Sequence, residues 1–460
     1  MSDYLFMLAR RLGARQRQLF AQVEQAAAQA QMHLFLAGGA MRDLLAGLPI
    51  RDLDFCVEGP ALTLVRRLDR KSFAVVSSDE RQQSAEMLFA GTWPLEIAMC
   101  RQERYAKSGG RAEITRATIQ DDLRRRDLTV NAIALSLSAG SRGLLLDPAN
   151  GLADITRKEL RALHNYSFYD DPSRLLRLIR FQSRLQYSIE EKTQAQFASA
   201  LESGVLEQIP PRLLWRELAQ LAREPDTAHA VKALSSFGLL PAFEPHLQPN
   251  KIDLPALRHL DKCRRLVEDS GVRVNTLGPF LYGLTRKLSA AERANLRTRI
   301  GLSAAGARLW TELEARGKGL QKGLPGKSGS QNSNLFRLLS DQDPALTLFL
   351  FAFSPLQPVR ERLRHYFAKL RPLARDVTER EIEQLGVKPD SPKFARVREA
   401  YLTARLDNKI KKKADPARLL RAGLSADRPG ASPAPVADSR SRAASTKPRP
   451  PGLSGSPGSV

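Results

Sequence analysis

The feature that most constrains the fold is a change of pattern at residues 147–151, a turn of sequence Asp-Pro-Ala-Asn-Gly. Before the turn, short apolar runs that indicate strands (33–37, 53–57, 73–77, 86–90 and 95–99) follow a helical segment at 4–31. After the turn the pattern is almost entirely helical, with long helices expected at 170–186 and 211–223. The chain therefore predicts a small α/β or α+β head followed by a helical remainder.

Length and charge narrow the class of protein. With 460 residues the chain is too long for one ordinary core, and its 42% apolar content suffices for two to four domains. The net charge of +23 favours polyanionic partners such as RNA, DNA or anionic membrane surfaces. No apolar run approaches the roughly 18 residues of a membrane span, and the run at 345–353 predicts a buried helix.

The cysteines and the two terminal segments indicate the cellular compartment and the ends of the folded region. Cys56, Cys100 and Cys263 are isolated, odd in number and without metal-ligand spacing, which favours a reducing cytoplasm. The Arg-rich stretch at 5–31 is open to interpretation as a transit peptide, but interrupting acids favour a plain first helix. Residues 425–460 are rich in Pro, Ser, Gly and Ala, so we expect a disordered basic tail. The segment 317–334 has the composition of a loop.

A pair of carboxylates marks the first candidate site. Asp52 and Asp54 are two residues apart, so in an extended strand both side chains leave the same face. Paired hard oxygen ligands suit Mg²⁺, which usually shares its coordination with substrate phosphates. Glu96 on a later strand is a candidate third carboxylate. The alternative for each of these acids is an ordinary solvated position.

Glycines precede this pair. Gly38 and Gly39 lie between a strand and a helix, where absent side chains let the backbone approach a phosphate. Arg42 follows within one helical turn. An ordinary tight turn is the alternative, and the nearby carboxylates favour the ligand interpretation.

Two arginine-rich blocks follow. In the block at 122–132, three consecutive arginines form either a solvated or RNA-binding face or a bidentate phosphate site that Asp127 and Asn131 orient. In the block at 170–181, acids and a proline precede a helix whose arginines recur every three residues. In one interpretation this is an ordinary capped helix with a basic surface. In the other, Asp171 and Arg174 offer an acceptor and a donor to the edge of a base, and Arg177 and Arg180 neutralise phosphates.

These blocks, in this order, resemble the class II tRNA nucleotidyltransferase and bacterial poly(A) polymerase family, within the polymerase-beta-like nucleotidyltransferases. The matching segments are 38–43 (Gly-Gly-x-x-Arg-Asp), 52–54 (Asp-x-Asp), 101–105 (Arg-x-Glu-x-Tyr), 125–132 (Arg-Arg-Asp-x-Thr-x-Asn-Ala), 147–154 (Asp-Pro-x-x-Gly-x-x-Asp) and 170–174. Segment 381–389 is similar to the family's C-terminal element. Two departures stand out: Asp170 replaces the family's glutamate, and residues 89–94 are atypical.

The resemblance implies an α+β nucleotidyltransferase head with a mixed sheet (1–146), a helical neck with the nucleotide-selecting motif (147–245), a helical RNA-binding body and tail (246–424) and the disordered tail (425–460). It implies that Asp52 and Asp54 bind two Mg²⁺ ions, with Glu96 as a third catalytic carboxylate. The implied nucleotide-binding residues are Gly38, Gly39, Arg42, Arg126, Asp127, Asn131, Asp171, Arg174, Arg177 and Arg180.

The implied activity is template-independent addition of CCA, or of its CC or A part, to tRNA 3′ ends from CTP and ATP. The full-length basic segment at 101–123 argues modestly against an enzyme that stops after CC. Poly(A) polymerase is the alternative activity, and an inactive RNA-binding relative and a DNA-acting relative are the others. RNA, most plausibly a tRNA 3′ end, is the expected partner and a membrane is not. The sequence leaves the oligomeric state open.

Overall fold

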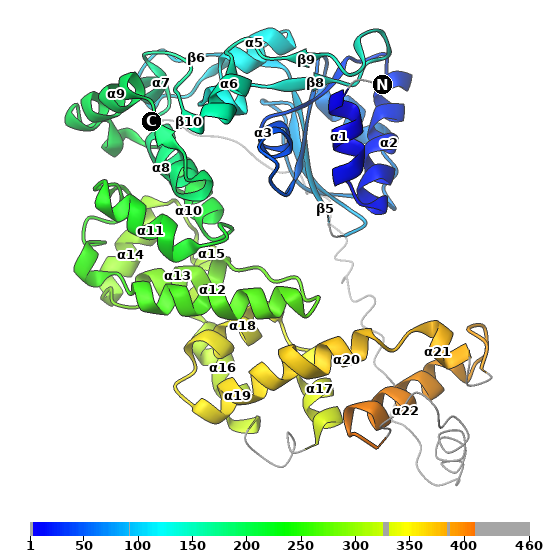
Figure 1. Ribbon diagram of the computed structural model, residues 1–460. Helices are drawn as coiled ribbons and strands as arrows, with labels where there is room; N and C mark the ends of the chain where they lie inside the picture. The colour runs from blue at the N-terminus through cyan, green and yellow to red at the C-terminus, as the bar shows by residue number, and fades with distance from the viewer. Residues whose placement is uncertain (1–2, 92, 325–330, 384–386, 410–460) are drawn as a thin grey trace, which may run out of the picture. The chain divides into compact units, whose positions relative to one another are not determined.

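The structure is a computed structural model that describes residues 3–91, 93–324, 331–383 and 387–409 (Figure 1). Contacts divide the chain into two compact units, Met1–Asp376 and Val377–Val460. The expected boundaries at 146, 245 and 424 make a finer division and stay a prediction, and the expected tail at 425–460 lies outside the described residues. Among the described helices, none is long and apolar enough to cross a membrane.

The head of the first unit is a mixed sheet, as predicted. Its strands are β1 (Leu34–Ala37), β2 (Leu53–Val57), β3 (Phe73–Asp79), β4 (Ser84–Phe89), β5 (Trp93–Met99), β8 (Ala134–Ser136) and β9 (Leu145–Leu146). The order across the sheet is β3-β4-β5-β2-β1-β8-β9. Strands β2 and β5 are parallel, and the other neighbours are antiparallel. Two separate strand pairs join β6 (Arg101–Arg104) to β7 (Glu113–Arg116) and β10 (Glu159–Leu160) to β11 (Ser188–Ile189).

Helices fill most of the remaining chain. Those of the head are α1 (Asp3–Arg11), α2 (Ala14–Gln29), α3 (Gly39–Leu45), α4 (Ala61–Arg67), α5 (Ile119–Arg124), η1 (Thr129–Asn131), η2 (Ala139–Ser141) and α6 (Gly151–Arg157). The first unit continues with α7 (Ser167–Asp170), α8 (Ser173–Leu185), α9 (Glu191–Glu202), η3 (Val205–Gln208), α10 (Pro211–Leu221), α11 (Thr227–Ser236), η4 (Leu240–Ala242), η5 (Pro249–Lys251), α12 (Leu254–Asp269), α13 (Leu277–Thr285) and α14 (Ala290–Arg299). It ends with α15 (Ala304–Thr311), α16 (Leu313–Gly323), α17 (Asn332–Ser340), α18 (Pro344–Phe353), α19 (Gln357–His365), the π-helix η7 (Tyr366–Leu370) and α20 (Arg371–Arg375). The second unit holds α21 (Glu379–Glu383) and α22 (Phe394–Leu406).

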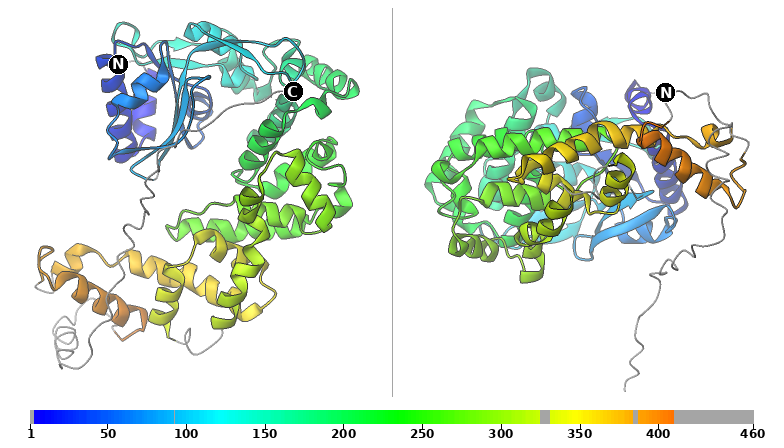
Figure 2. Two further views of the ribbon diagram at one scale, coloured as in Figure 1. Left: turned by 180° about the vertical axis from the view of Figure 1, so that it is seen from behind. Right: turned by 90° about the horizontal axis from the view of Figure 1, so that it is seen from below.

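Strand β1 is buried along its whole length, which explains why its sequence is continuously apolar. Side chains alternate along a strand, so neighbours in sequence enter opposite cores. On one face, Phe35 and Cys56 belong to a buried cluster with Leu123 of α5. On the other, Phe55 packs against Phe20 of α2, with 5.7 Å between ring centroids. Helices α1 and α2 lie together along that side of the sheet in both orientations (Figures 1 and 2).

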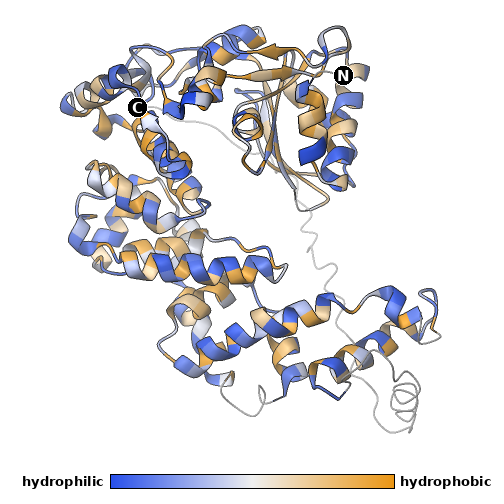
Figure 3. Cartoon of the chain, viewed as in Figure 1, coloured by the Kyte–Doolittle hydropathy of each residue, from blue (hydrophilic) through white to orange (hydrophobic). Residues whose placement is uncertain are grey.

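Helix α18 confirms the buried apolar helix that was expected at 345–353. It begins at Pro344, whose missing N–H suits a first helical position, and the preceding Asp343 carboxylate accepts a hydrogen bond from the Ala345 N–H at 2.9 Å. Its side chains from Leu346 to Ala352 are all buried. The helix is apolar along nearly its whole length (Figure 3), so it forms the centre of the helical core around it.

Two of the long helices expected from the sequence are interrupted in the structure. The expected helix at 4–31 is two helices, because Gly13 leaves the helical conformation and its N–H donates to Gln16 Oε1 at 2.8 Å, which starts α2. The expected helix at 170–186 begins at Ser173. Asp171 is extended (φ −132°, ψ 91°) because a following proline disfavours helical geometry, and its carboxylate accepts from the Ser173 N–H at 3.0 Å.

Other expectations need smaller corrections. The loop expected at 317–334 is wrong at both ends, since α16 extends to Gly323 and α17 begins at Asn332. Residues 325–330 lie outside the described residues. So do residues 384–386, which belong to the C-terminal segment 381–389. Strands β6 and β7 were not predicted, because their side chains are polar and lack apolar alternation. The turn at 147–151 is present, with the Gly151 N–H donating to Asp147 Oδ1 at 2.7 Å.

Candidate active site

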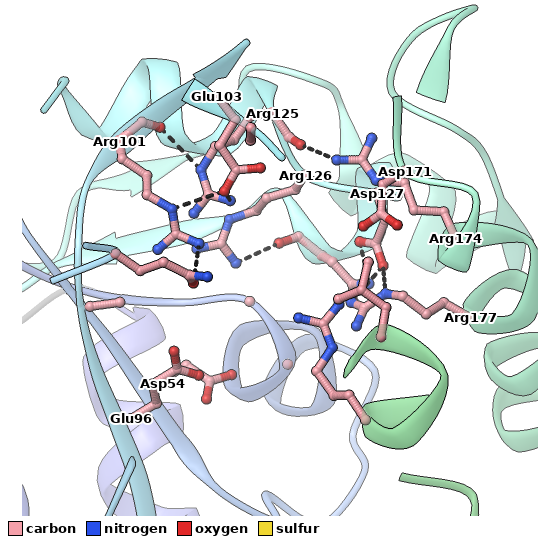
Figure 4. A pocket seen from close by; sticks show the side chains of 18 of the residues that line it. Asp54, Glu96, Arg101, Glu103, Arg125, Arg126, Asp127, Asp171, Arg174 and Arg177 are labelled. Carbon is pink, nitrogen blue, oxygen red and sulfur yellow. Dashed lines mark hydrogen bonds and ion pairs between the residues drawn. The ribbon is translucent and has the colours of Figure 1, made fainter. Parts of the chain in front are cut away.

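A single pocket of about 370 Å³ in the first unit gathers every residue proposed from the sequence (Figure 4). Its walls come from the head sheet, from the segment around α5 and from helices α8 and α10. The thirteen candidates that line it are Gly38, Gly39, Arg42, Asp52, Asp54, Glu96, Arg126, Asp127, Asn131, Asp171, Arg174, Arg177 and Arg180. The topology therefore brings together residues that are far apart in sequence, while the role of each stays a prediction.

The carboxylates meet where β2 and β5 run side by side. Asp54 on β2 is directly opposite Glu96 on β5 in the parallel register. Asp52 precedes the first residue of β2, so the expectation that both aspartates lie within the strand is wrong for Asp52, which is exposed. Burial raises the pKa of Asp54 well above its usual value, and the charges of Asp52 and Glu96 raise it further. Burial likewise raises the pKa of Glu96, against the lowering effect of Arg101. Negative charge is thus concentrated at one wall.

This donor set fits a divalent cation that also takes ligands from a substrate. Within the described ranges, no group of three or more His, Cys, Asp or Glu side chains is arranged to hold a metal by itself. Asp52 and Asp54 supply hard oxygen atoms, and burial together with the charges of Asp52 and Glu96 raises the pKa of Asp54 although Arg126 lowers it. Mg²⁺ is commonly bound by one or two carboxylates with waters and phosphate oxygens completing its shell. The residues present fit that arrangement.

The glycine pair allows a close approach in the pocket. Gly38 has φ +69° and ψ −131°, a conformation that side-chain-bearing residues rarely adopt. A Cβ atom there would lie 2.7 Å from Arg126 Nη1 and 3.3 Å from Asp54 Oδ2. At Gly39 a Cβ atom would lie 3.4 Å from Asp54 Oδ2. The absent side chains keep space open between the carboxylates and the arginines, which an ordinary surface turn does not require.

Asp122, which was not proposed as a site residue, organises the triple-arginine segment. It is fully buried and accepts from Arg125 Nη2 at 2.6 Å and from Arg126 Nη2 at 3.0 Å. Burial raises its pKa, but the two guanidinium groups outweigh burial and lower the pKa to about 2. Arg125 also donates to Glu103 at 3.0 Å. The i,i+3 and i,i+4 spacing of these pairs was the signal available in the sequence.

Arg42 is buried and its charge is already engaged. Its Nε and Nη2 atoms donate to Asp43 Oδ1 at 2.9 and 2.8 Å, and its Nη1 donates to Asn131 Oδ1 at 2.6 Å. The guanidinium also lies over the Phe181 ring, 4.9 Å from its centroid. Arg184 donates to the other oxygen of Asp43 at 2.7 Å. Asn131 therefore holds Arg42 with its side chain, and its carbonyl accepts from Arg126 of its own segment at 3.2 Å.

Asp171 and Arg174, which were predicted to select the nucleotide, lie at the start of α8. Arg174 Nη1 donates to Ser167 Oγ at 2.9 Å, and its Nη2 donates to the Arg125 carbonyl at 2.7 Å. Asp171 Oδ1 accepts from the Ser173 N–H and hydroxyl at 3.0 and 2.6 Å. Asp170, which replaces the family's glutamate, faces His164 at 3.9 Å. The brace on Arg174 is thus made by Ser167 and a main-chain carbonyl.

Arg177 and Arg180 are held by Asp127 and by two glutamates that the sequence motifs did not indicate, Glu217 and Glu224. Arg177 pairs with Asp127 at 2.7 Å and approaches Glu217 of α10 at 3.6 Å. Arg180 pairs with Glu217 at 3.1 Å and with Glu224 at 2.9 Å. Both glutamates are almost fully buried. The two arginines therefore lock α8 to α10 and to the head, and much of their charge is neutralised before any ligand binds.

Comparison with known proteins agrees with the geometry. Residues 34–161 match the model of the poly(A) polymerase head domain. A CC-adding tRNA nucleotidyltransferase of Deinococcus radiodurans is 33% identical over 60% of this chain and 69% of its own length. An A-adding tRNA nucleotidyltransferase of Halalkalibacterium halodurans is 39% identical over 47% of this chain and 51% of its own length.

The matches are partial in length. The chain spans about half the length of the A-adding relatives that it matches, with 45%, 51% and 41% of three of them covered. In fold, a CCA-adding enzyme solved without ligand aligns over 92% of this chain and 99% of its own, with a TM-score of 0.53 and 24% identity. From the residues gathered in the pocket and these likenesses, the chain belongs to the class II tRNA nucleotidyltransferase (CCA-adding) family.

Proposed function

We propose that this protein adds nucleotides to tRNA 3′ ends without a nucleic-acid template, completing all or part of a CCA sequence from CTP and ATP with Mg²⁺. One observation carries the proposal: a single pocket holds both the carboxylate wall of Asp52, Asp54 and Glu96 and the Asp171–Arg174 pair. The three carboxylates are suited to binding the cations that accompany the reacting phosphates, and the Asp171–Arg174 pair is suited to hydrogen bonding with the edge of a base. The names of the A-adding and CC-adding relatives support tRNA as the acceptor.

In the proposed reaction, the terminal 3′-hydroxyl oxygen of the RNA loses its proton to solvent and attacks the α-phosphorus of the nucleotide, and pyrophosphate leaves. Asp52 and Asp54 would hold the divalent cations, which would supply Lewis-acid stabilisation of the developing oxygen charges. Arg126, fixed by Asp122 close to Gly38, places its positive charge beside the polyphosphate. The glycine pair leaves the backbone accessible to phosphate oxygens.

Base selection is proposed for the Asp171–Arg174 pair. Two of the Arg174 guanidinium N–H groups are engaged with Ser167 and the Arg125 carbonyl, and its other N–H donors are left for a ligand. Asp171 uses Oδ1 to cap α8, which leaves Oδ2 to accept from a base amino group. A donor and an acceptor on a fixed frame discriminate base edges by hydrogen-bond pattern, because a mismatched polar group stays unpaired.

The proposal is tested with purified protein, Mg²⁺, labelled CTP or ATP, and tRNA transcripts that end before CCA, after C or after CC. Incorporation that stops at or before a completed CCA end, whichever step it begins from, supports the proposal. Separate use of CTP and ATP on the three ends defines whether CC, A or both are added. Absence of incorporation on every tRNA would contradict the proposed activity.

Poly(A) synthesis is the second candidate, since the matched head model is that of poly(A) polymerases. An unrelated RNA of equal length, included in the same assay with ATP, distinguishes the two activities. Extension of that RNA into a long A tract, with no preference for tRNA, would replace tRNA end completion by poly(A) synthesis.

A further inference from the structure

The arginines of the pocket differ in how far their charges are already satisfied. Eleven arginines line it. Seven of them contact a carboxylate: Arg42, Arg101, Arg125, Arg126, Arg177, Arg180 and Arg184. Arg81 and Arg174 donate to carbonyl or hydroxyl oxygens. Arg212 and Arg216 remain, and in the part of the chain that the structure describes neither guanidinium group takes part in a hydrogen bond or ion pair.

Helix α10 presents these two side chains on a fixed support. They are four residues apart, so they lie one above the other on one face of the helix. Both are exposed, whereas Leu214, Leu218 and Glu217 on the other faces are buried. Glu217 is clamped by Arg177 and Arg180 of α8, which fixes the rotation of α10 about its axis. The two guanidinium groups therefore enter the pocket from a rigid helix.

These two arginines line the same pocket as the carboxylates. Arg212, Arg216, Asp54 and Glu96 are all among its lining residues. Two positive charges that no carboxylate pairs with, within the described residues, therefore share the pocket in which the reacting phosphate would lie. Exposed guanidinium groups at a pocket rim bind phosphate oxygens readily, because Arg is weakly hydrated and donates in a planar fork.

We infer that Arg212 and Arg216 bind the backbone phosphates of the last nucleotides at the RNA 3′ end and hold that end against the carboxylates. The inference rests on the proposed function and adds two residues that the sequence motifs did not indicate. A positively charged groove that tracks the backbone is the usual means of holding a single strand without reading its bases. The arginines that are paired with Asp43, Asp122 and Asp127 shape the nucleotide side of the pocket instead.

The test is equilibrium binding of a labelled tRNA transcript ending after CC, in EDTA and across a salt series, to wild type and Arg212→Gln/Arg216→Gln. Loss of two single-strand phosphate contacts should reduce the slope of log K against log salt by about 1.4. Low-salt affinity should fall about tenfold. The matched control Arg66→Gln/Arg67→Gln removes the same charge from exposed positions on α4, outside the pocket, and should leave the slope near that of wild type. A thermal melt confirms that each variant is folded.

Steady-state kinetics distinguish binding of the RNA backbone phosphates from binding of the nucleotide triphosphate. The double variant should raise KM for tRNA while KM for ATP or CTP changes less than twofold. A rise confined to KM for the nucleotide would mean that these arginines bind the triphosphate and would overturn the inference. A salt slope for the double variant equal to that of the control would also overturn it. Because RNA binding is measured without turnover, failure of the inference is distinguishable from failure of the proposed function, in which wild type itself incorporates nothing.

Discussion

Glu217→Gln is predicted to destabilise the first unit, because Glu217 is the shared acceptor in the charge network between α8 and α10. Its side chain is 1% exposed and lies 3.1 Å from Arg180 Nε and 3.6 Å from Arg177 Nη1. Arg180 is itself 5% exposed and depends on Glu217 and Glu224 for its partners. The substitution keeps the shape of the side chain and removes its charge.

The magnitude follows from the geometry. At 3.1 Å and an effective dielectric constant of about 20, the Arg180–Glu217 attraction is about 5 kcal/mol before desolvation is counted. Removing one partner of a buried pair generally costs about 3–5 kcal/mol, since the other charge stays buried. Each arginine here keeps a second carboxylate, and glutamine keeps one acceptor oxygen. We therefore expect a loss of about 2–3 kcal/mol in the free energy of unfolding.

Urea unfolding followed by circular dichroism measures this loss as a shift of the midpoint at constant slope. Glu202→Gln, on an exposed position of α9, is the matched control and should stay within about 0.5 kcal/mol of wild type. The double variant Glu217→Gln/Arg180→Gln should lose less than the sum of the single losses, because the two positions are in contact. Strict additivity, or a Glu217→Gln midpoint equal to the control, would refute the coupling that the structure implies.

Three further substitutions test separate parts of the site. Arg174→Ala should reduce the preference between CTP and ATP more than it reduces tRNA affinity, which competition between the labelled nucleotides measures; unchanged preference would contradict a base-reading role. Gly38→Ala should lose about 2 kcal/mol of stability from backbone strain and raise KM for nucleotide, whereas Gly204→Ala, also at positive φ but with open space around its Cβ, should leave KM unchanged. Asp122→Asn should be about 2 kcal/mol less stable than wild type near pH 7. Because the folded pKa of Asp122 is lowered to about 2, this difference is present above about pH 4, shrinks as the pH falls toward 2, and would refute the pairing if it stayed constant across acid titration.

Local sequence patterns predicted the head, and the thirteen pocket residues followed from those patterns together with the resemblance to the nucleotidyltransferase family. The Asp-x-Asp pair, the glycines and the arginines each belong to a short segment whose strand or helix could be predicted from its own pattern. The partners that hold them could not be predicted in this way. Glu217 lies 37 residues beyond Arg180 in sequence, and their contact exists because α8 packs on α10.

Packing also determines which arginines pair with carboxylates and which remain to bind phosphate, and this could not be predicted from the sequence. The spacing of Arg177 and Arg180 suggested phosphate ligands, yet buried carboxylates take up much of their charge, whereas Arg212 and Arg216 carry the free charge without belonging to a recognised motif. Proline and glycine had stronger local effects than helical periodicity. The helices expected at 4–31 and 170–186 therefore break at Gly13 and at Asp171, the residue before Pro172. Polar strands such as β6 and β7 give no apolar alternation to predict.

The central claim is that the carboxylates beside β2 hold the cation for nucleotide transfer, and single-turnover incorporation by Asp54→Ala tests it most directly. The assay uses a tRNA transcript ending after CC with labelled ATP, a transcript ending before CCA with labelled CTP, and Mg²⁺ at saturation. The account predicts that wild type extends at least one transcript, that Asp54→Ala extends neither, and that both proteins bind tRNA with similar affinity in EDTA. Retention of the wild-type incorporation rate by Asp54→Ala would contradict it.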